Sequence, residues 1–167
     1  MSSLITRNPG HDLNLVGAAG EYFVCAEICR FGYLALLTPK NNPLFDVVAT
    51  TTSGNITVPI QVKTRSIHNK QGWKVSANFC TDPSPGDLFV VLVDLKESGL
   101  PAFLVYDHGP LAKRIDDVYR KYMAKPKRDG QPRKEVGFRW FDEVSFNDED
   151  RSRINNWQPI LKKLSAT

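Results

Sequence analysis

The sequence has few cysteines and no long apolar run, and each shortage excludes a class of protein. It contains three cysteines, Cys25, Cys29 and Cys80, among 167 residues, and an odd number argues against a disulfide framework. They form no CxxC pair and have no nearby histidine, so we expect buried thiols rather than a metal site. No apolar stretch reaches the roughly 18 residues of a membrane span, and the first residues lack a signal peptide's apolar run. We therefore expect a cytoplasmic protein with no membrane partner.

The sequence also lacks the common motifs of nucleotide-binding proteins and hydrolases. There is no P-loop, no dinucleotide-binding glycine pattern and no GxSxG nucleophile motif, and the three histidines show no metal-ligand spacing. The composition, 41% hydrophobic and 24% charged, excludes a disordered or fibrous chain. A formal net charge of +4 permits a polyanionic partner without requiring one.

Hydrophobic spacing and turn residues predict a flexible arm over residues 1–11 and one domain over residues 12–167. The order of elements is helix, several strands, helix, strand, helix, which favours an α/β (α+β) sandwich with a mixed β-sheet flanked by helices. The expected helices are Asp12–Phe31, Pro110–Met123 and about Asp148–Leu164, the last interrupted near Pro159. The expected strands are Tyr33–Leu37, Phe45–Thr51, Ile56–Lys63, Trp73–Ala77, Asp87–Leu95, Ala102–Tyr106 and Val136–Phe141.

The first helix is apolar on nearly every side, which predicts a buried helix. Its small residues, Gly17 to Gly20, would let another backbone come close. Gly32 stands where a terminating glycine belongs. Within this apolar stretch stands Glu21, whose carboxylate needs a partner, either a cation or a metal.

Three polar residues follow on neighbouring strands. Asp46 stands near the start of the second expected strand, and Gln61 and Lys63 stand at the end of the third. A two-residue turn at 53–54 pairs Asp46 with Gln61, and one at 54–55 pairs it with Lys63; in both, the three side chains share a face. A three-residue loop centred on residue 54 would pair Asp46 with Val62 and break the arrangement. The alternate residues expected to fill the core are Val58, Ile60 and Val62.

A carboxylate, an amide and a lysine that converge beside Glu21 predict a site for a hard cation. Mg²⁺ takes oxygen ligands, usually one or two carboxylates together with substrate phosphate and water. Asp46 and Glu21 would supply charge, and the Gln61 side-chain carbonyl would supply a neutral oxygen. Lys63 would hold or help deprotonate the attacking water and offset charge on a phosphate.

At this point the sequence resembles a known superfamily. The segments GAAGEYFVCAEICRFGY, LFDVVA and IQVKT are similar to the PD-(D/E)XK, or restriction-endonuclease-like, nucleases, and most similar to the group with a helical glutamate, such as Holliday-junction resolvases and Mrr-type enzymes. In this resemblance Asp46 matches the acidic residue that opens one strand, Gln61 and Lys63 match the D/E-x-K motif, and Glu21 matches the helical glutamate. The resemblance covers about residues 13–66.

The resemblance implies a mixed sheet flanked by helices and an Mg²⁺- (or Mn²⁺-) dependent DNA endonuclease that leaves 5′-phosphates. Two residues depart from the pattern: Phe45 replaces the usual proline, and Gln61 replaces a carboxylate. The second departure leaves Glu21 more responsible for the metal. It also keeps open a non-catalytic nucleic-acid-binding module and a protein-interaction component of a defence or toxin system. By family analogy we expect a homodimer or higher homo-oligomer, since cutting a duplex needs two sites.

Basic residues beyond the motif are candidates for nucleic-acid binding. Arg65, Lys70 and Lys74 follow it, and Lys127 and Arg128 lie in the most basic part of the chain, which is expected to be an exposed loop. Trp73 lies among the first three and could stack on a splayed base or pack in the core. The aromatic residues expected in the core or in helix docking are Phe138, Trp140, Phe141 and Trp157.

Overall fold

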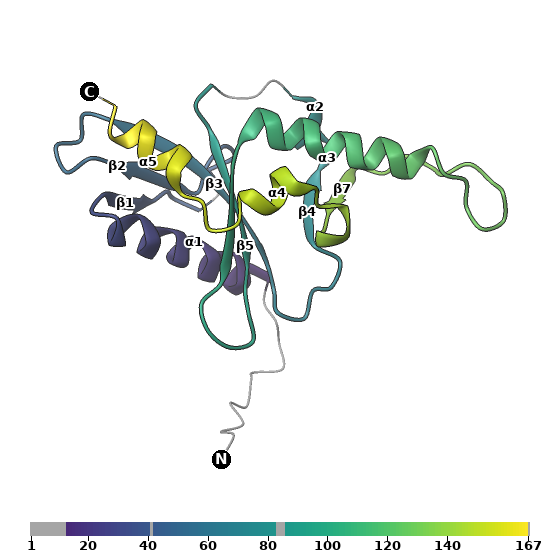
Figure 1. Ribbon diagram of the computed structural model, residues 1–167, viewed down its shortest axis with the longest axis horizontal. Helices are drawn as coiled ribbons and strands as arrows, with labels where there is room; N and C mark the ends of the chain where they lie inside the picture. The colour runs from purple at the N-terminus through teal and green to yellow at the C-terminus, as the bar shows by residue number, and fades with distance from the viewer. Residues whose placement is uncertain (1–12, 41, 83–85, 167) are drawn as a thin grey trace, which may run out of the picture.

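The computed structural model describes residues 13–40, 42–82 and 86–166, and its centre is a five-stranded mixed sheet (Figure 1). The strand order is β1-β2-β3-β5-β6; β3 and β5 are parallel, and the other neighbouring pairs are antiparallel. The strands are β1 (Leu34–Leu37), β2 (Val47–Thr50), β3 (Thr57–Arg65), β5 (Phe89–Asp94) and β6 (Ala102–Asp107). The α+β fold class predicted from the sequence is therefore confirmed.

One face of the sheet packs on α1 (Leu13–Arg30) and α5 (Gln158–Leu164). Val24 and Ile28 of α1 and Ile160 of α5 are fully buried there. This core also contains Val58, Ile60 and Val62, as predicted. Gly20 marks the closest approach between helix and sheet, because a Cβ there would lie 1.9 Å from Thr64 Oγ1. The expected role of the small residues is thus confirmed at Gly20.

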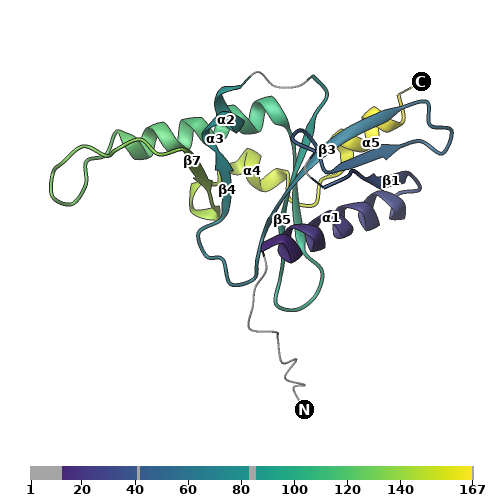
Figure 2. The ribbon, with the colours of Figure 1, turned by 180° about the vertical axis from the view of Figure 1, so that it is seen from behind.

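The opposite face packs on α2 (Ala77–Thr81), α3 (His108–Met123) and a separate two-stranded sheet. That small sheet pairs β4 (Trp73–Ser76) with β7 (Phe138–Phe141) in antiparallel register. Figure 2 shows from behind the two layers that cover the central sheet, with α1 and α3 on opposite sides of the central strands. All six residues of β5 are buried between them, as expected of a strand that is covered on both faces.

The C-terminal part is divided more finely than the sequence predicted. The expected last helix is two helices, α4 (Asp148–Ser152) and α5, and a 3₁₀ turn, η1 (Glu143–Ser145), precedes them. The break falls before Pro159, which lies in the first turn of α5. Proline is well suited to that position because the first helical N–H groups have no partner within the helix. Residues 1–12, where the flexible arm and the first residue of the expected helix fall, lie outside the described residues.

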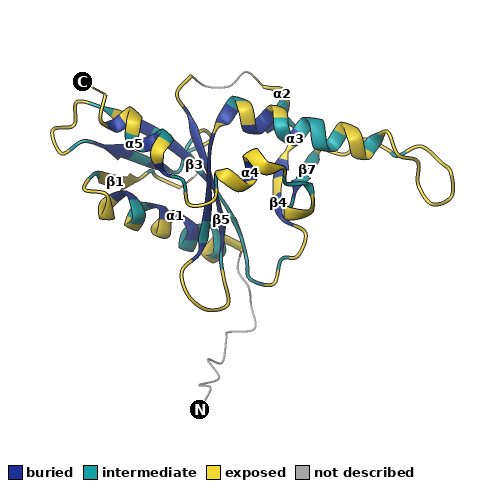
Figure 3. Cartoon of the chain, in the orientation of Figure 1, coloured by how far each residue is buried: buried dark blue, intermediate teal, exposed yellow. Residues whose placement is uncertain are grey.

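Two predictions about burial are wrong. The first helix is not buried on all sides: Leu15 and Tyr22 are exposed by 67% and 64%, and Figure 3 shows this outer side of α1 in yellow. The cysteines are not all buried either, since Cys29 is exposed and Cys25 and Cys80 are only partly covered. The error about α1 has a simple cause: apolar composition does not reveal that a helix packed on one face of a sheet is covered on one side only. No helix among the described residues is long and apolar enough to cross a membrane.

Candidate functional site

The Asp46 carboxylate is fixed against the backbone of β3. Its Oδ2 accepts a hydrogen bond from the Val62 N–H at 2.7 Å, and its own N–H donates to the Ile60 carbonyl at 2.9 Å. Val47 of β2 pairs with Ile60 of β3, so in the same register the preceding Asp46 lies opposite Gln61. This pairing is one of the alternatives that the sequence left open. The carboxylate is thus held beside the segment that carries Gln61 and Lys63.

Gln61 and Lys63 lie on the face of β3 opposite the α1 core, because the intervening Val62 belongs to that core. Both line a cavity of about 230 Å³ that also contacts Ser76 and His108. Gln61 Oε1 is buried and has no hydrogen-bond partner among the described residues. A buried carbonyl oxygen without a donor is unfavourable, so its position calls for a bound proton donor or cation.

Glu21, on α1, is partly buried, and its charge interacts with those of Asp46 and Lys40. Burial raises the pKa of its carboxyl, the negative charge of Asp46 raises it further, and the positive charge of Lys40 lowers it. The two carboxylates are therefore close enough for their charges to repel. Such repulsion is relieved by a cation between or beside them.

These residues fit a hard divalent cation. Carboxylate and amide oxygens, the side-chain groups of Glu21, Asp46 and Gln61, are donor types that Mg²⁺ or Mn²⁺ accepts. The described part of the chain contains no group of three or more His, Cys, Asp or Glu side chains able to hold a metal. The candidate site does not conflict with this, since its third oxygen comes from glutamine.

Lys40 is a site neighbour that the sequence reasoning missed. Its charge acts on Glu21, although it lies 19 positions further along the chain. No helix or strand period links the two positions, because Lys40 follows β1 and Glu21 lies in α1. Only the return of the chain beside α1 brings them together.

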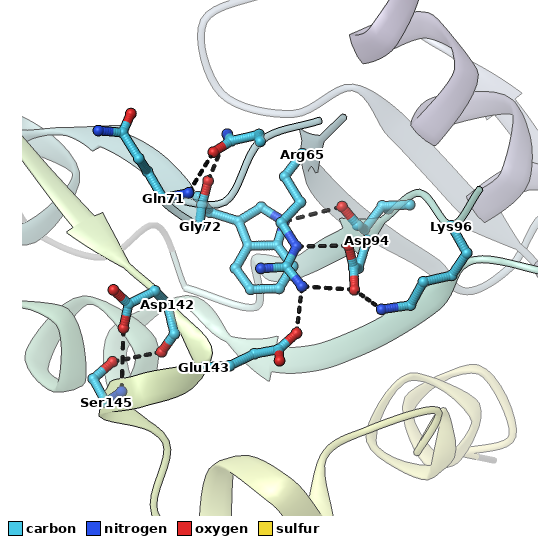
Figure 4. Close-up of polar contacts among 11 residues, drawn as sticks. Arg65, Gln71, Gly72, Asp94, Lys96, Asp142, Glu143 and Ser145 are labelled. Atoms are coloured by element: carbon cyan, nitrogen blue, oxygen red, sulfur yellow. Dashed lines mark hydrogen bonds and ion pairs between the residues drawn. The ribbon is translucent and has the colours of Figure 1, made fainter. Parts of the chain in front are cut away.

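Arg65, predicted to contact nucleic acid, has partners within the fold (Figure 4). Its guanidinium binds both oxygens of Asp94, at 2.6 and 2.7 Å, pairs with Glu143, and lies over the Trp73 ring at 4.4 Å from its centroid. Lys96 pairs with the same Asp94 carboxylate. Arg65 thus ties β3 to β5 and η1, and we leave it out of the proposed nucleic-acid contacts.

Trp73 is a packed core residue. Only 2% of it is exposed, and its indole N–H donates to the Val93 carbonyl at 3.0 Å. The alternative that it stacks on a base is therefore excluded. The other basic candidates are all exposed to solvent: Lys70, Lys74, Lys127 and Arg128.

The remaining predicted core aromatics divide into two groups. Phe141 and Trp157 are buried, at 0% and 4% exposure, as predicted. Phe138 and Trp140 are only partly buried, and Lys74 Nζ lies 4.1 Å from the centroid of the Phe138 ring. They occupy the outer face of the two-stranded sheet, because their neighbours Arg139 and Phe141 point inward and are buried.

Comparisons with known proteins find similarity in structure only. Neither a family model nor a curated protein matches the sequence. A bacterial homing endonuclease is similar at a TM-score of 0.49 and 16% identity, over 91% of this chain and 94% of the other. A Holliday junction resolvase from the archaeal hyperthermophile Archaeoglobus fulgidus is similar at a TM-score of 0.42 and 15% identity, over 78% and 86%. At these levels of similarity neither match assigns a role to this chain, so the candidate site rests on the chain's own residues.

Proposed function

We propose that the protein is a metal-dependent DNA endonuclease that hydrolyses phosphodiester bonds to leave 5′-phosphates. The observation that carries the proposal is the buried, unpartnered Gln61 Oε1. It stands opposite Asp46 on the neighbouring strand, and Asp46 interacts with Glu21. A cation bound by this oxygen and by the two repelling carboxylates would explain both features.

Each residue then has a role set by its place. Glu21, Asp46 and Gln61 hold Mg²⁺ or Mn²⁺, and the Val62 N–H keeps the Asp46 carboxylate oriented through Oδ2. When bound, the metal supplies charge that stabilises the developing negative charge on the phosphate. Lys63, which lines the adjoining cavity, orients the attacking water and donates to a phosphate oxygen.

The exposed basic residues complete the proposed contacts with DNA. Lys70, Lys74, Lys127 and Arg128 lie on the side of the molecule that carries the small sheet and the loop after α3. Backbone contacts from such residues position a nucleic acid without reading its sequence. A homodimer would supply the second active site that a double-strand cut needs, and light scattering of the purified chain tests it.

A cleavage assay tests the function. The substrates are plasmid, linear duplex and four-way-junction DNA, each with Mg²⁺ or Mn²⁺, and the variants are Asp46→Ala and Lys63→Ala. The matched control is Lys162→Ala, which removes an exposed lysine on α5. Cleavage that is lost in both site variants and in EDTA, but kept in the control, supports the proposal. No cleavage by the wild type, together with salt-sensitive binding, would instead favour a non-catalytic nucleic-acid-binding module, and neither activity would favour a protein-interaction component.

A further inference from the structure

A groove of about 770 Å³ lies apart from the candidate metal site, because none of Glu21, Asp46, Gln61 and Lys63 is among its lining residues. It lies between the C-terminal half of α3, the loop that follows it and the outer face of β7 (Figure 1). We call it the α3–β7 groove. Its aromatic lining is Tyr119, Tyr122, Phe138 and Trp140, and its basic lining is Lys70, Lys127, Arg133 and Lys134.

The aromatic rings form a surface that no other part of the described fold covers completely. Tyr122 is 53% exposed, and Trp140 and Phe138 are partly exposed on the neighbouring strand. Phe138 and Trp140 meet edge to face, with centroids 6.3 Å apart. Exposed rings grouped in one concave place provide the flat apolar contact that an aromatic ligand needs.

Arginine side chains hold the tyrosines in place. The Arg133 guanidinium lies 4.0 Å from the Tyr122 ring centroid, and its Nη1 donates to Tyr122 Oη at 2.7 Å. Arg139 lies 3.5 Å from the Tyr119 ring centroid. The rings are thus ordered before a ligand arrives, which lowers the entropic cost of binding.

The charge around the rings favours an anion. Four lysine and arginine side chains line the groove, whereas Asp142 is the single carboxylate among its lining residues. Flat rings surrounded by cations match a chain that alternates bases and phosphates. A peptide rich in Asp and Glu would match the charge but not the rings.

The groove and the cavity of Gln61 and Lys63 are each lined by one residue of a paired couple in the small sheet. Ser76 of β4 lines the cavity of Gln61 and Lys63, and it pairs with Phe138 of β7, which lines the groove. Lys74 lies between, opposite Trp140. One polyanionic chain can therefore follow the outer face of the small sheet from one cavity to the other.

We propose that the α3–β7 groove binds a single-stranded segment of the nucleic-acid substrate, with unpaired bases stacked on Tyr122 and Trp140 and phosphates on the surrounding cations. The inference rests on the proposed function, because it names the form of nucleic acid that the nuclease takes. Paired bases in a duplex expose only their edges, so they cannot use the rings. The substrate class is DNA with an unpaired stretch beside the cleaved bond.

Binding measured without cleavage tests the proposal. The full-length protein, in EDTA, is titrated with fluorescein-labelled oligothymidylate of about 15 nucleotides, near the upper end of site sizes on stacking surfaces, and with a blunt duplex hairpin. The expected result is single-strand binding about tenfold or more tighter than duplex binding. Tryptophan fluorescence is quenched by the single strand, and this signal comes from Trp140 because Trp73 and Trp157 are buried.

Variants separate stacking from charge. Tyr122→Ala weakens single-strand binding about tenfold, since one base stack is removed. Tyr122→Phe keeps the aromatic ring and therefore keeps the wild-type affinity. Trp140→Phe abolishes the quenching and leaves the affinity within about threefold. The matched control is Tyr22→Ala, which removes a tyrosine on α1 that is at least as exposed as Tyr122 and leaves binding unchanged.

Three results would overturn the proposal: equal binding of duplex and single strand, binding unaffected by Tyr122→Ala, and competition by polyglutamate as effective as competition by oligothymidylate. The last would assign the groove to acidic peptides. Lys63→Ala, which is expected to lose cleavage, separates the cleavage measurement from the binding measurement. Failure of the groove proposal can therefore be told from failure of the proposed function. Cleavage by the wild type without single-strand binding refutes the groove alone, whereas binding by the wild type without cleavage refutes the nuclease alone.

Discussion

The carboxylate of Asp46 and the backbone N–H of Val62 form a 2.7 Å hydrogen bond that joins the start of β2 to the end of β3. Because Val62 lies between Gln61 and Lys63, this bond sets the position of the carboxylate relative to both. One carboxylate oxygen is used for structure, and Oδ1 accepts no hydrogen bond from the described residues. The bond gives Asp46 a role in the fold that can be separated from the metal-binding role that we propose for it.

Two substitutions at Asp46 separate these roles. Asp46→Asn keeps an oxygen that can accept from Val62, so the free energy of unfolding changes little, but loss of the charge weakens Mn²⁺ binding at least tenfold. Asp46→Ala also loses the hydrogen bond and destabilises the fold by about 1–3 kcal/mol. Titration calorimetry with Mn²⁺ and urea denaturation measure the two effects. Equal Mn²⁺ affinity in wild type and Asp46→Asn would remove Asp46 from the site.

Gln61→Glu changes the charge of the proposed metal site without changing its shape. A third carboxylate beside Asp46 and Glu21 should tighten Mn²⁺ binding several-fold, because carboxylates bind hard cations more strongly than amides. Gln61→Leu should weaken it, and it should leave folding intact because it removes the unpartnered Oε1. Calorimetry at neutral pH gives the comparison. Identical affinities in all three proteins would contradict a ligand role for Gln61.

Gly20→Ala tests the contact between α1 and β3. The new Cβ would meet Thr64 Oγ1 at 1.9 Å, and we expect a loss of about 1–3 kcal/mol in the free energy of unfolding. The matched control is Gly17→Ala on the same helix, where a Cβ meets nothing within 4 Å. There the higher helix propensity of alanine should stabilise the protein by up to about 1 kcal/mol. Denaturant melts that show the same change for both variants would refute the close approach.

The ion pairs around Asp94 predict an acid-sensitive fold. Burial raises the pKa of Asp94, but hydrogen bonds from Arg65 and Lys96 outweigh it and hold the pKa below its ordinary value of 3.8. A lowered folded-state pKa contributes stability that is present above pH 3.8 and is lost as the pH falls through the folded value. Asp94→Asn should cost about 3–5 kcal/mol at neutral pH, since it leaves Arg65 poorly paired, and should reduce the loss of stability below pH 4.

An exposed ion pair supplies the control for Asp94. Asp87 pairs with Lys163 at 2.6 Å, and both side chains are largely exposed. Asp87→Asn should change the free energy of unfolding by less than about 1 kcal/mol, because solvent screens the pair. Urea melts at several pH values compare the two variants. Similar losses in both would show that burial does not set the importance of Asp94.

The three thiols should react at different rates with iodoacetamide. Burial raises the pKa of Cys25 and of Cys80 to about 11, so little thiolate is present at pH 8. Cys29 is exposed and should be alkylated first, at least tenfold faster than the other two. Mass spectrometry of peptides from a time course measures the order. Faster alkylation of Cys80 than of Cys29 would contradict the packing of α2 on α3.

Local chemistry in the sequence was enough for most elements and for choosing the candidate site residues, whose role stays a prediction. Alternating apolar residues in β3 and the continuous apolar run of β5 determine which strands have one covered face and which have two. Gly32, at φ +88°, ends α1 as its position predicted. Glu21, Asp46, Gln61 and Lys63 could be singled out because the spacing on two consecutive strands and one helix is a short-range pattern.

The contacts between distant segments could be decided only by the tertiary structure. Which register the β2–β3 hairpin takes, which charges face Glu21, and whether Arg65 is free or paired all depend on segments that no sequence period connects. Asp94 and Glu143 lie 29 and 78 positions from Arg65, yet they bind its guanidinium. The packing of the sheet sets these distances, and the same packing leaves Phe138 and Trp140 on an outer face that their apolar composition alone would have assigned to the core.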